Sequence, residues 1–229
     1  MKTLFSRTPF SRTLLSRLLP LVAVAALATG CAAPKQIDYA AFKQARPRTI
    51  LVLPPQNESP EVQATYSVLS QATYPLAEAG YYVLPVTLVD ETFKQNGITQ
   101  PGEMHAVAPA RLKEIFGADA ALYIDITSYG TKYYVIDSAT VVTAKAKLVD
   151  LKTGTQLWTG SASASSNEGG NSSGGGLVGM LIAAAVKQII NSATDAGHTV
   201  AGVTTSRLLT AGQPGGILYG PRSPKYNAD

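Results

Sequence analysis

The chain has 229 residues, of which 45% are apolar and 15% charged, as in an ordinary globular domain and unlike a disordered or fibrous chain. Its net charge of +4 arises in the first 30 residues, which hold four of the 19 basic side chains and no acid. The remainder carries 15 basic and 15 acidic side chains, so a nucleic-acid-binding surface is not expected. The single cysteine excludes an intramolecular disulfide bond and a Cys-x-x-Cys metal site.

Residues 1–30 have the pattern of a targeting signal. A basic segment precedes an apolar run at 18–27, which is too short to span a bilayer and is typical of a secretory signal peptide. Residues 27–31, Leu-Ala-Thr-Gly-Cys, resemble the lipobox of bacterial lipoproteins, in which small residues precede a cysteine that receives a diacylglyceryl group. We therefore expect lipidation at Cys31, a mature chain that begins there, and stable anchoring by the diacylglyceryl group and an N-acyl chain.

Other interpretations of this segment stay open. Ala26 and Ala28 also fit the small-x-small rule of ordinary signal cleavage, which would leave Cys31 as a free thiol, and a third interpretation is a retained anchor. Ala32 occupies the place where inner-membrane lipoproteins of the enteric type often carry aspartate. By that resemblance we expect an outer-membrane anchor, with the domain facing the periplasm or, alternatively, the cell exterior.

The mature chain predicts one α/β domain with a mixed sheet. We expect a lipidated tether at 31–47, the domain at 48–210 and an extended tail at 211–229. Inside the domain, a Gly/Ser-rich loop at 165–176 precedes an apolar helix at 177–193.

The domain is expected to begin with a β-α-β unit. Continuous apolar runs at 49–53 and 81–84 predict two buried strands. Between them, Ser-Pro-Glu at 59–61 has the pattern of a helix start, and Gly80 offers a helix end. Pro75 is expected to kink or shorten this helix.

The second half of the domain is expected to end in an antiparallel hairpin. Short helices are predicted at 88–95 and 109–116, the latter closed by Gly117, and a strand at 121–126. At 139–165, apolar and polar residues alternate on both sides of a glycine-containing turn. This alternation predicts a hairpin with one solvent-exposed face.

Candidates for chemistry are few. His105 and His198 are the only histidines, so a zinc site has no obvious ligand set, and no metal or cofactor is predicted. Asp195 precedes His198 by three residues, but no Gly-x-Ser-x-Gly motif exists, and an exposed helix end is expected there. Asp125 is expected to be buried in its strand and to need a partner, and the acids at 90–91 are expected to cap a helix start. The sequence predicts no catalytic site.

Residues 177–190 carry the clearest functional possibility. They would form a helix of roughly 21 Å, which is short of a full membrane span. Gly175, Gly179 and Ala183 repeat small residues every four positions, a spacing that permits close helix approach. The segment is either a core helix that covers the sheet or a surface that packs against another protein, a second copy or the bilayer. A phosphate-binding loop is disfavoured because no Gly-Lys-Ser/Thr follows the glycines.

Several stretches together resemble known envelope proteins. Those at 49–57, 116–130 and 148–160 are similar to the periplasmic α/β domain of CsgG-type curli-secretion lipoproteins and to the N-terminal domain of TolB. With 57–62 and 74–85, the chain more closely resembles a family of bacterial lipoproteins of unknown function that includes a neisserial surface-lipoprotein antigen. The resemblance implies an envelope role beside a CsgG-type lipoprotein and another small lipoprotein, and it does not imply a pore.

The sequence therefore predicts a non-enzymatic outer-membrane lipoprotein, anchored through acyl chains on Cys31, that contributes to an envelope assembly or secretion complex. Its contact region is expected at 165–190, with envelope proteins or a second copy as partner. The alternative is a periplasmic module that binds a glycan or peptide. In that case the tyrosines in the third strand would line a groove: Tyr123, Tyr129, Tyr133 and Tyr134.

Overall fold

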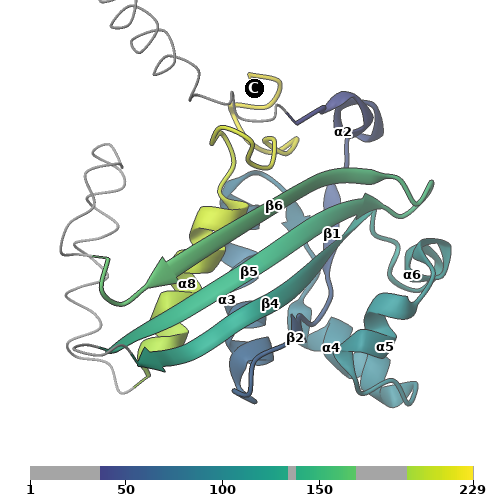
Figure 1. Ribbon diagram of the computed structural model, residues 1–229. Helices are drawn as coiled ribbons and strands as arrows, with labels where there is room; N and C mark the ends of the chain where they lie inside the picture. Colours follow the sequence, from purple (N-terminus) through teal and green to yellow (C-terminus); the bar gives the residue numbers. More distant parts are fainter. Residues whose placement is uncertain (1–36, 134–137, 169–194, 229) are drawn as a thin grey trace, which may run out of the picture. The chain divides into compact units, whose positions relative to one another are not determined.

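A mixed sheet of six strands forms the centre of the fold, in the order β3-β1-β4-β5-β6, with β2 paired to β4 beyond the end of β1 (Figure 1). The computed structural model describes residues 37–133, 138–168 and 195–228. The predicted single α/β domain with a mixed sheet is confirmed, while the predicted apolar helix at 177–193 lies outside the described residues.

The parallel half of the sheet is the predicted β-α-β unit. Strand β1 (Thr49–Val52) pairs in parallel with β3 (Tyr82–Val83) and with the first residues of β4 (Ala120–Tyr133). Strand β2 (Gln56–Asn57) continues the pairing along β4. The apolar runs thus form buried strands because both faces of β1 are covered.

The antiparallel half is a three-stranded meander of β4, β5 (Ser138–Asp150) and β6 (Gln156–Ser165). The predicted hairpin at 139–165 is confirmed as β5 and β6. A bulge between Ile126 and Ser128 adds one residue to β4 and reverses the direction of its later side chains.

Two long helices cover most of one face of the sheet. Helices α3 (Ala64–Glu78) and α8 (Ala196–Leu209) pack behind β4, β5 and β6 in the view of Figure 1. Alternate residues of the strands point into this main core, which explains the alternation of apolar and polar residues in the sequence. Its largest fully buried side chains are Ile50, Leu76, Leu122, Ile124, Ile126, Leu148 and Leu209.

Three shorter helices cover part of the opposite face. Helices α4 (Val86–Gln95), α5 (Pro101–Ala106) and α6 (Pro109–Phe116) pack over β1 and the first residues of β4. This smaller core contains Leu51, Leu53, Val89, Phe93, Met104, Leu112, Ala121, Tyr123 and Leu151. Among the described elements, none lies over the rest of this face (Figure 1). The end of α6 at Gly117, in the left-handed conformation, is as predicted.

Helix α3 begins later than predicted and continues through its proline. The Asn57 side chain accepts hydrogen bonds from both the backbone N and the Oγ of Ser59, so Ser59 belongs to a turn, and the helix begins at Ala64. Pro75 lies buried inside the helix, which runs on to Glu78. Gly80 closes it at a φ of 97°, as predicted.

The two ends of the described chain contain structure that the sequence did not reveal. The predicted tether includes α2 (Ala40–Ala45), which buries Phe42. The tail from residue 211 runs through turns packed on the domain instead of extending from it. Tyr81 donates a hydrogen bond to the Leu218 carbonyl (2.6 Å), and the Trp158 indole donates to the Gly215 carbonyl (3.0 Å).

Candidate functional site

The two predicted functional positions, Cys31 and the region from 169 into the apolar segment, lie outside the described residues. The structure does fix the points where the chain leaves and re-enters the domain. At the exit, Glu168 forms an ion pair of 2.6 Å with Arg207 of α8. At the re-entry, the Asp195 carboxylate accepts a hydrogen bond of 3.0 Å from the backbone N of His198 and caps α8. The Asp-x-x-His spacing is thus a helix cap, in agreement with the expected helix end.

His198 contacts a serine that sequence spacing could not have identified. Its Nδ1 lies 2.9 Å from the Oγ of Ser67 on α3, and the Tyr129 hydroxyl donates to that same Oγ at 2.9 Å. A side chain at Gly197 would clash with the Tyr129 ring, so glycine permits this approach. Burial raises the pKa of Tyr129, which keeps its hydroxyl protonated as a donor.

The Ser67–His198 pair lacks the third member of a catalytic triad. In a triad, a carboxylate holds the second ring nitrogen of the base. Here the Gln71 amide lies 2.8 Å from Nε2 of His198, while the Asp195 carboxylate is engaged with the backbone. Ser67 is also buried, which leaves a substrate no access to its hydroxyl. The arrangement joins α3, β4 and α8, and we assign it a structural role.

His105 is held as a neutral ring beside the partly covered face of the sheet. Its Nε2 donates to the Pro54 carbonyl (2.9 Å), so its Nδ1 accepts from the Gln56 amide (2.9 Å). Burial lowers the pKa of His105 below its usual value, in agreement with this neutral form. Its ring meets that of Tyr123 edge to face, with the centroids 5.2 Å apart. Both ring nitrogens are therefore engaged within the protein.

No group of three or more His, Cys, Asp or Glu residues that could hold a metal ion occurs in the part of the chain that the structure describes. The two histidines lie in different places, His105 on α5 and His198 on α8.

Two predictions about acids are wrong. Asp125 is only partly buried, and it lies on β4 in register with Lys145 of β5. Asp90 does not cap a helix start, because α4 begins four residues earlier at Val86. Its carboxylate instead forms an ion pair of 2.6 Å with Lys94, one turn further along the helix.

The strand tyrosines do not share a groove. Tyr123 lies in the smaller core and Tyr129 in the main core, because the bulge in β4 turns the later side chain to the other face. Tyr133 is 86% exposed near the end of the strand, and Tyr134 lies outside the described residues. This geometry removes the sequence argument for the ligand-binding alternative.

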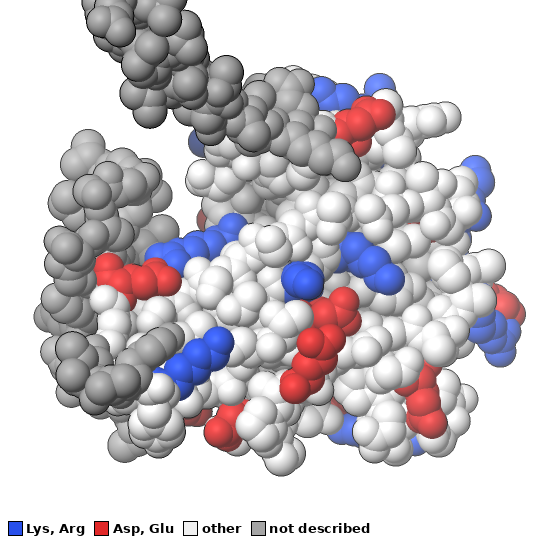
Figure 2. Space-filling model, in the orientation of Figure 1, with Lys and Arg blue, Asp and Glu red and all other residues white. Residues whose placement is uncertain are grey.

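The uncovered face of the meander is polar and carries charges of both signs (Figure 2). Its side chains on β5 and β6 form cross-strand pairs, Thr143 with Ser163, Lys145 with Ser161, and Lys147 with Thr159. The predicted solvent-exposed face of the hairpin is therefore confirmed.

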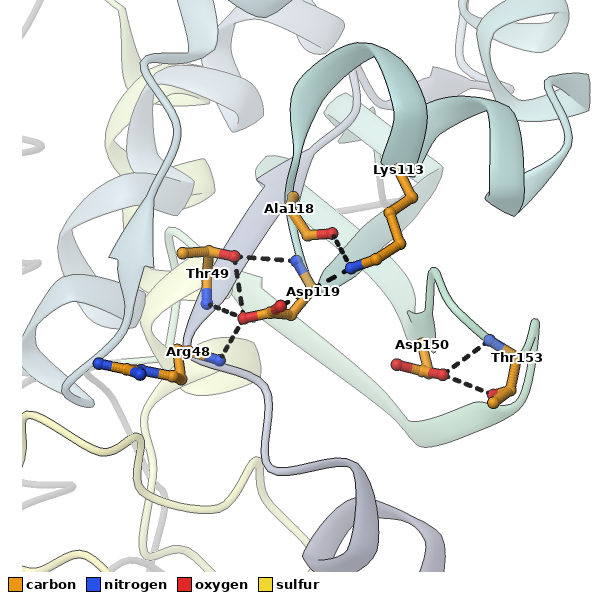
Figure 3. A network of polar contacts seen from close by, with 7 residues as sticks. All are labelled: Arg48, Thr49, Lys113, Ala118, Asp119, Asp150 and Thr153. Atoms are coloured by element: carbon orange, nitrogen blue, oxygen red, sulfur yellow. Dashed lines mark hydrogen bonds and ion pairs between the residues drawn. The ribbon is translucent and has the colours of Figure 1, made fainter.

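A carboxylate fixes the end of the sheet where the chain enters the domain (Figure 3). The Oδ2 of Asp119 accepts hydrogen bonds from the backbone N of Arg48 (3.0 Å), the backbone N of Thr49 (3.2 Å) and the Thr49 hydroxyl (3.1 Å). Lys113 lies 3.8 Å from its other oxygen. At the neighbouring strand end, Asp150 accepts from the backbone N of Thr153 at 2.8 Å. These contacts lock the turns that lead into β1 and β4 and out of β5.

The fold is a mixed α/β domain with helices on both faces of its sheet, and known proteins specify the family. The model of the family described as "Putative lipoprotein GNA1162-like" matches residues 37–222. The curated "Putative lipoprotein NMB1124/NMB1162" of Neisseria meningitidis serogroup B (strain ATCC BAA-335 / MC58) is 51% identical over 207 residues, which cover 90% of this chain and 95% of that protein. The chain belongs to the GNA1162-like lipoprotein family.

One solved structure agrees with this family. The crystal structure of lipoprotein GNA1162 from Neisseria meningitidis is 55% identical, covers 64% of this chain and 100% of its own, and superposes with a TM-score of 0.52. A PelC dodecamer from Paraburkholderia phytofirmans is 14% identical over 77% of this chain and 91% of its own, with a TM-score of 0.39, which is too distant to inform function. Of the described helices, none has the length and apolar character needed to cross a bilayer.

Proposed function

We propose that this protein is acylated on Cys31, anchored in the outer membrane, and a non-enzymatic component of an envelope assembly. Family membership supports the lipoprotein character. The described domain supports a non-catalytic role, because its two histidines and its Ser67–His198 contact are held by structural partners. A CsgG-type lipoprotein, a second small lipoprotein or a second copy are the partners we propose.

The observation that supports this proposal is the position of the described residues on either side of the predicted contact region. The chain departs after Glu168, close to the end of β6, and returns at Asp195, which begins α8. Both points lie at one end of the sheet, since Ser165 pairs with Val141 early in β5. The chain enters the domain at the opposite end, where α2 leads into β1 at Thr49. The region at 165–190 is therefore attached far from the anchored end, and it can contact a partner away from the membrane.

Excision of residues 169–194 tests this function. A short Gly/Ser linker would replace them, and Glu168 and Asp195 would be kept so that the Arg207 ion pair and the α8 cap survive. In a control variant, only 169–176 is exchanged for another Gly/Ser sequence of equal length. We expect the control to co-purify with its envelope partners and the excised variant to lose them while it keeps the wild-type unfolding midpoint. Retention of the same partners by a folded excised variant would refute the proposed contact region.

A further inference from the structure

The described end of the domain that carries the tether is rich in exposed cations. Three of them follow α2 or lie on it, one lies in the turn between β5 and β6, and two lie in the C-terminal tail. They are Lys43, Arg46, Arg48, Lys152, Arg222 and Lys225. All six are exposed, although they come from three separate segments of the chain.

Shallow hollows around α2 connect these cations into one surface. One hollow of about 220 Å³ is lined by Lys43, Arg46 and residues of the tail. A second, of about 320 Å³, lies on the other side of α2 and includes Lys152. A third, of about 400 Å³, joins Arg48 to Arg222. We call this end, with its six cations, the basic end.

Two of the four acids of the basic end, Asp119 and Asp150, are partly or fully buried. The other two are Asp38 and Glu78. Asp119 and Asp150 accept hydrogen bonds from backbone N–H groups (Figure 3), and Asp38 accepts one from the backbone N of Ala40. All six cations are exposed, whereas only two of the four carboxylates are, so an approaching surface meets a net positive charge. Two cations extend over aromatic rings, Arg222 over Tyr82 and Lys225 over Tyr219.

The opposite end of the sheet has the reverse balance. It carries Glu58, Glu61, Glu168 and Asp195 against Lys132 and Arg207. The separation follows from the 14 residues of β4, which at 3.3 Å per residue span roughly 45 Å. The domain therefore has an electric dipole along its strands, with its positive end where the tether joins.

The tether is short enough to bring the basic end to the bilayer. Five residues separate Cys31 from Ile37, the first described residue, and the six steps between the two Cα atoms reach at most about 20 Å when extended. Charge interactions in physiological salt decay over about 8 Å. An anionic leaflet therefore acts on the basic end and hardly at all on the acidic end, so it orients the domain as well as attracting it.

We propose that the basic end docks on the anionic lipid surface in which the protein is anchored, and that it holds the strands upright with Glu168 and Asp195 away from the bilayer. This inference rests on the proposed acylation of Cys31. It assigns the six cations a common ligand, the phosphate groups of acidic lipids. A cation close to such a surface favours the docked orientation by roughly fivefold at moderate salt.

The test uses the acylated full-length mature chain in vesicles of phosphatidylcholine, with or without one quarter phosphatidylglycerol. Because acylation occupies Cys31, a single cysteine introduced at Gln44 or at Thr131 accepts a fluorescent donor, and the lipid headgroups carry the acceptor. Both positions are exposed, Gln44 at the basic end and Thr131 near the opposite end. We expect much stronger energy transfer from Gln44 than from Thr131 on anionic vesicles, and a smaller difference on neutral vesicles or in high salt.

Two matched variants distinguish the effect of the basic end from the effect of the protein's total charge. Replacing four cations of the basic end with glutamine, at Arg48, Lys152, Arg222 and Lys225, should abolish the difference between the two labels. A control variant replaces four exposed cations elsewhere, at Arg111, Lys132, Lys145 and Lys147, and so removes the same amount of charge. This control should preserve the difference in energy transfer between the two labels. Equal transfer from both labels in the anchored wild type, or equal effects of the two variants, would overturn the inference. Protein that fails to float with neutral vesicles contradicts the anchor itself, and the inference with it.

Discussion

Replacing Gly80 with alanine tests how firmly the tail is held against the domain. Gly80 ends α3 in a Schellman motif, in which its N–H bonds the Ala77 carbonyl (2.9 Å) and that of Tyr81 bonds the Leu76 carbonyl (3.1 Å). Gly97 ends α4 in the same way, at a φ of 80° against 97° for Gly80. The two glycines differ in their surroundings. A Cβ at Gly97 would meet nothing within 4 Å, whereas one at Gly80 would clash with the tail backbone at residues 220–223.

The magnitude follows from this difference. Alanine in the left-handed conformation costs about 1–2 kcal/mol, and this cost applies to both positions. At Gly80 the tail must also move away, which breaks the bonds from Gly220 N to the Ala79 carbonyl (2.8 Å) and from Arg222 N to the Gly80 carbonyl (3.0 Å). At about 1 kcal/mol each, these bonds add about 2 kcal/mol. We expect Gly97→Ala to lower the free energy of unfolding by about 1–2 kcal/mol and Gly80→Ala by about 3–4 kcal/mol.

Urea denaturation of the two variants measures the difference directly, and limited proteolysis of the tail reports whether it has detached. Gly80→Ala should expose the tail to cleavage, and Gly97→Ala should not. Equal destabilisation by the two substitutions would refute the docked tail, and with it the position of Arg222 and Lys225 in the basic end.

Two further predictions concern the histidine contacts. Ser67→Ala should lower the free energy of unfolding in urea by about 1–3 kcal/mol, because the Tyr129 hydroxyl and His198 lose their shared partner; an unchanged midpoint would show that the contact does not stabilise the fold. Because the pKa of His105 is lowered in the folded protein, the unfolded chain binds a proton at this histidine more readily. The contribution of His105 to the free energy of unfolding is therefore fully present above the ordinary pKa of 6.5 and decreases as the pH falls below it. His105→Gln should reduce the dependence of the free energy of unfolding on pH, measured by urea denaturation at pH 7.5, 6.5 and 5.5. An unchanged pH dependence would contradict a buried, neutral His105.

The sequence predicts most of the strands because their patterns are local. The continuous apolar run before Pro54 forms a strand covered on both faces, and strict alternation on both sides of Gly154 forms a hairpin covered on one. The end of α6 is also predicted from a local feature, because Gly117 readily adopts the left-handed conformation that ends the helix.

What the sequence did not predict depends on contacts between distant segments. Helix α2 is stabilised by Phe42, which packs into the main core. The six residues of this helix are too few to show a helical periodicity in the sequence. The tail is placed by bonds from Tyr81 and Trp158, neither of which is near it in sequence. The apolar neighbours of Asp125 predict burial, but its side chain lies outside the smaller core and is only partly buried.

The site was less predictable than the fold. Ser67 and His198 are 131 residues apart, so no spacing rule relates them. The basic end joins three segments, and the overall charge balance of the mature chain conceals it. The sequence does contain one relevant pattern, which is the pair of basic residues, Arg222 and Lys225, in a tail otherwise rich in glycine and proline.

Crosslinking in intact cells tests the central claim most directly. Tagged wild-type protein and a Cys31→Ala variant would be crosslinked, purified and analysed by mass spectrometry, with the intact mass of the mature chain measured in parallel. The account predicts an acylated N-terminal cysteine and stoichiometric envelope partners in the wild type, and the loss of both in the variant. An unmodified Cys31, or an identical set of partners in wild type and variant, would contradict it.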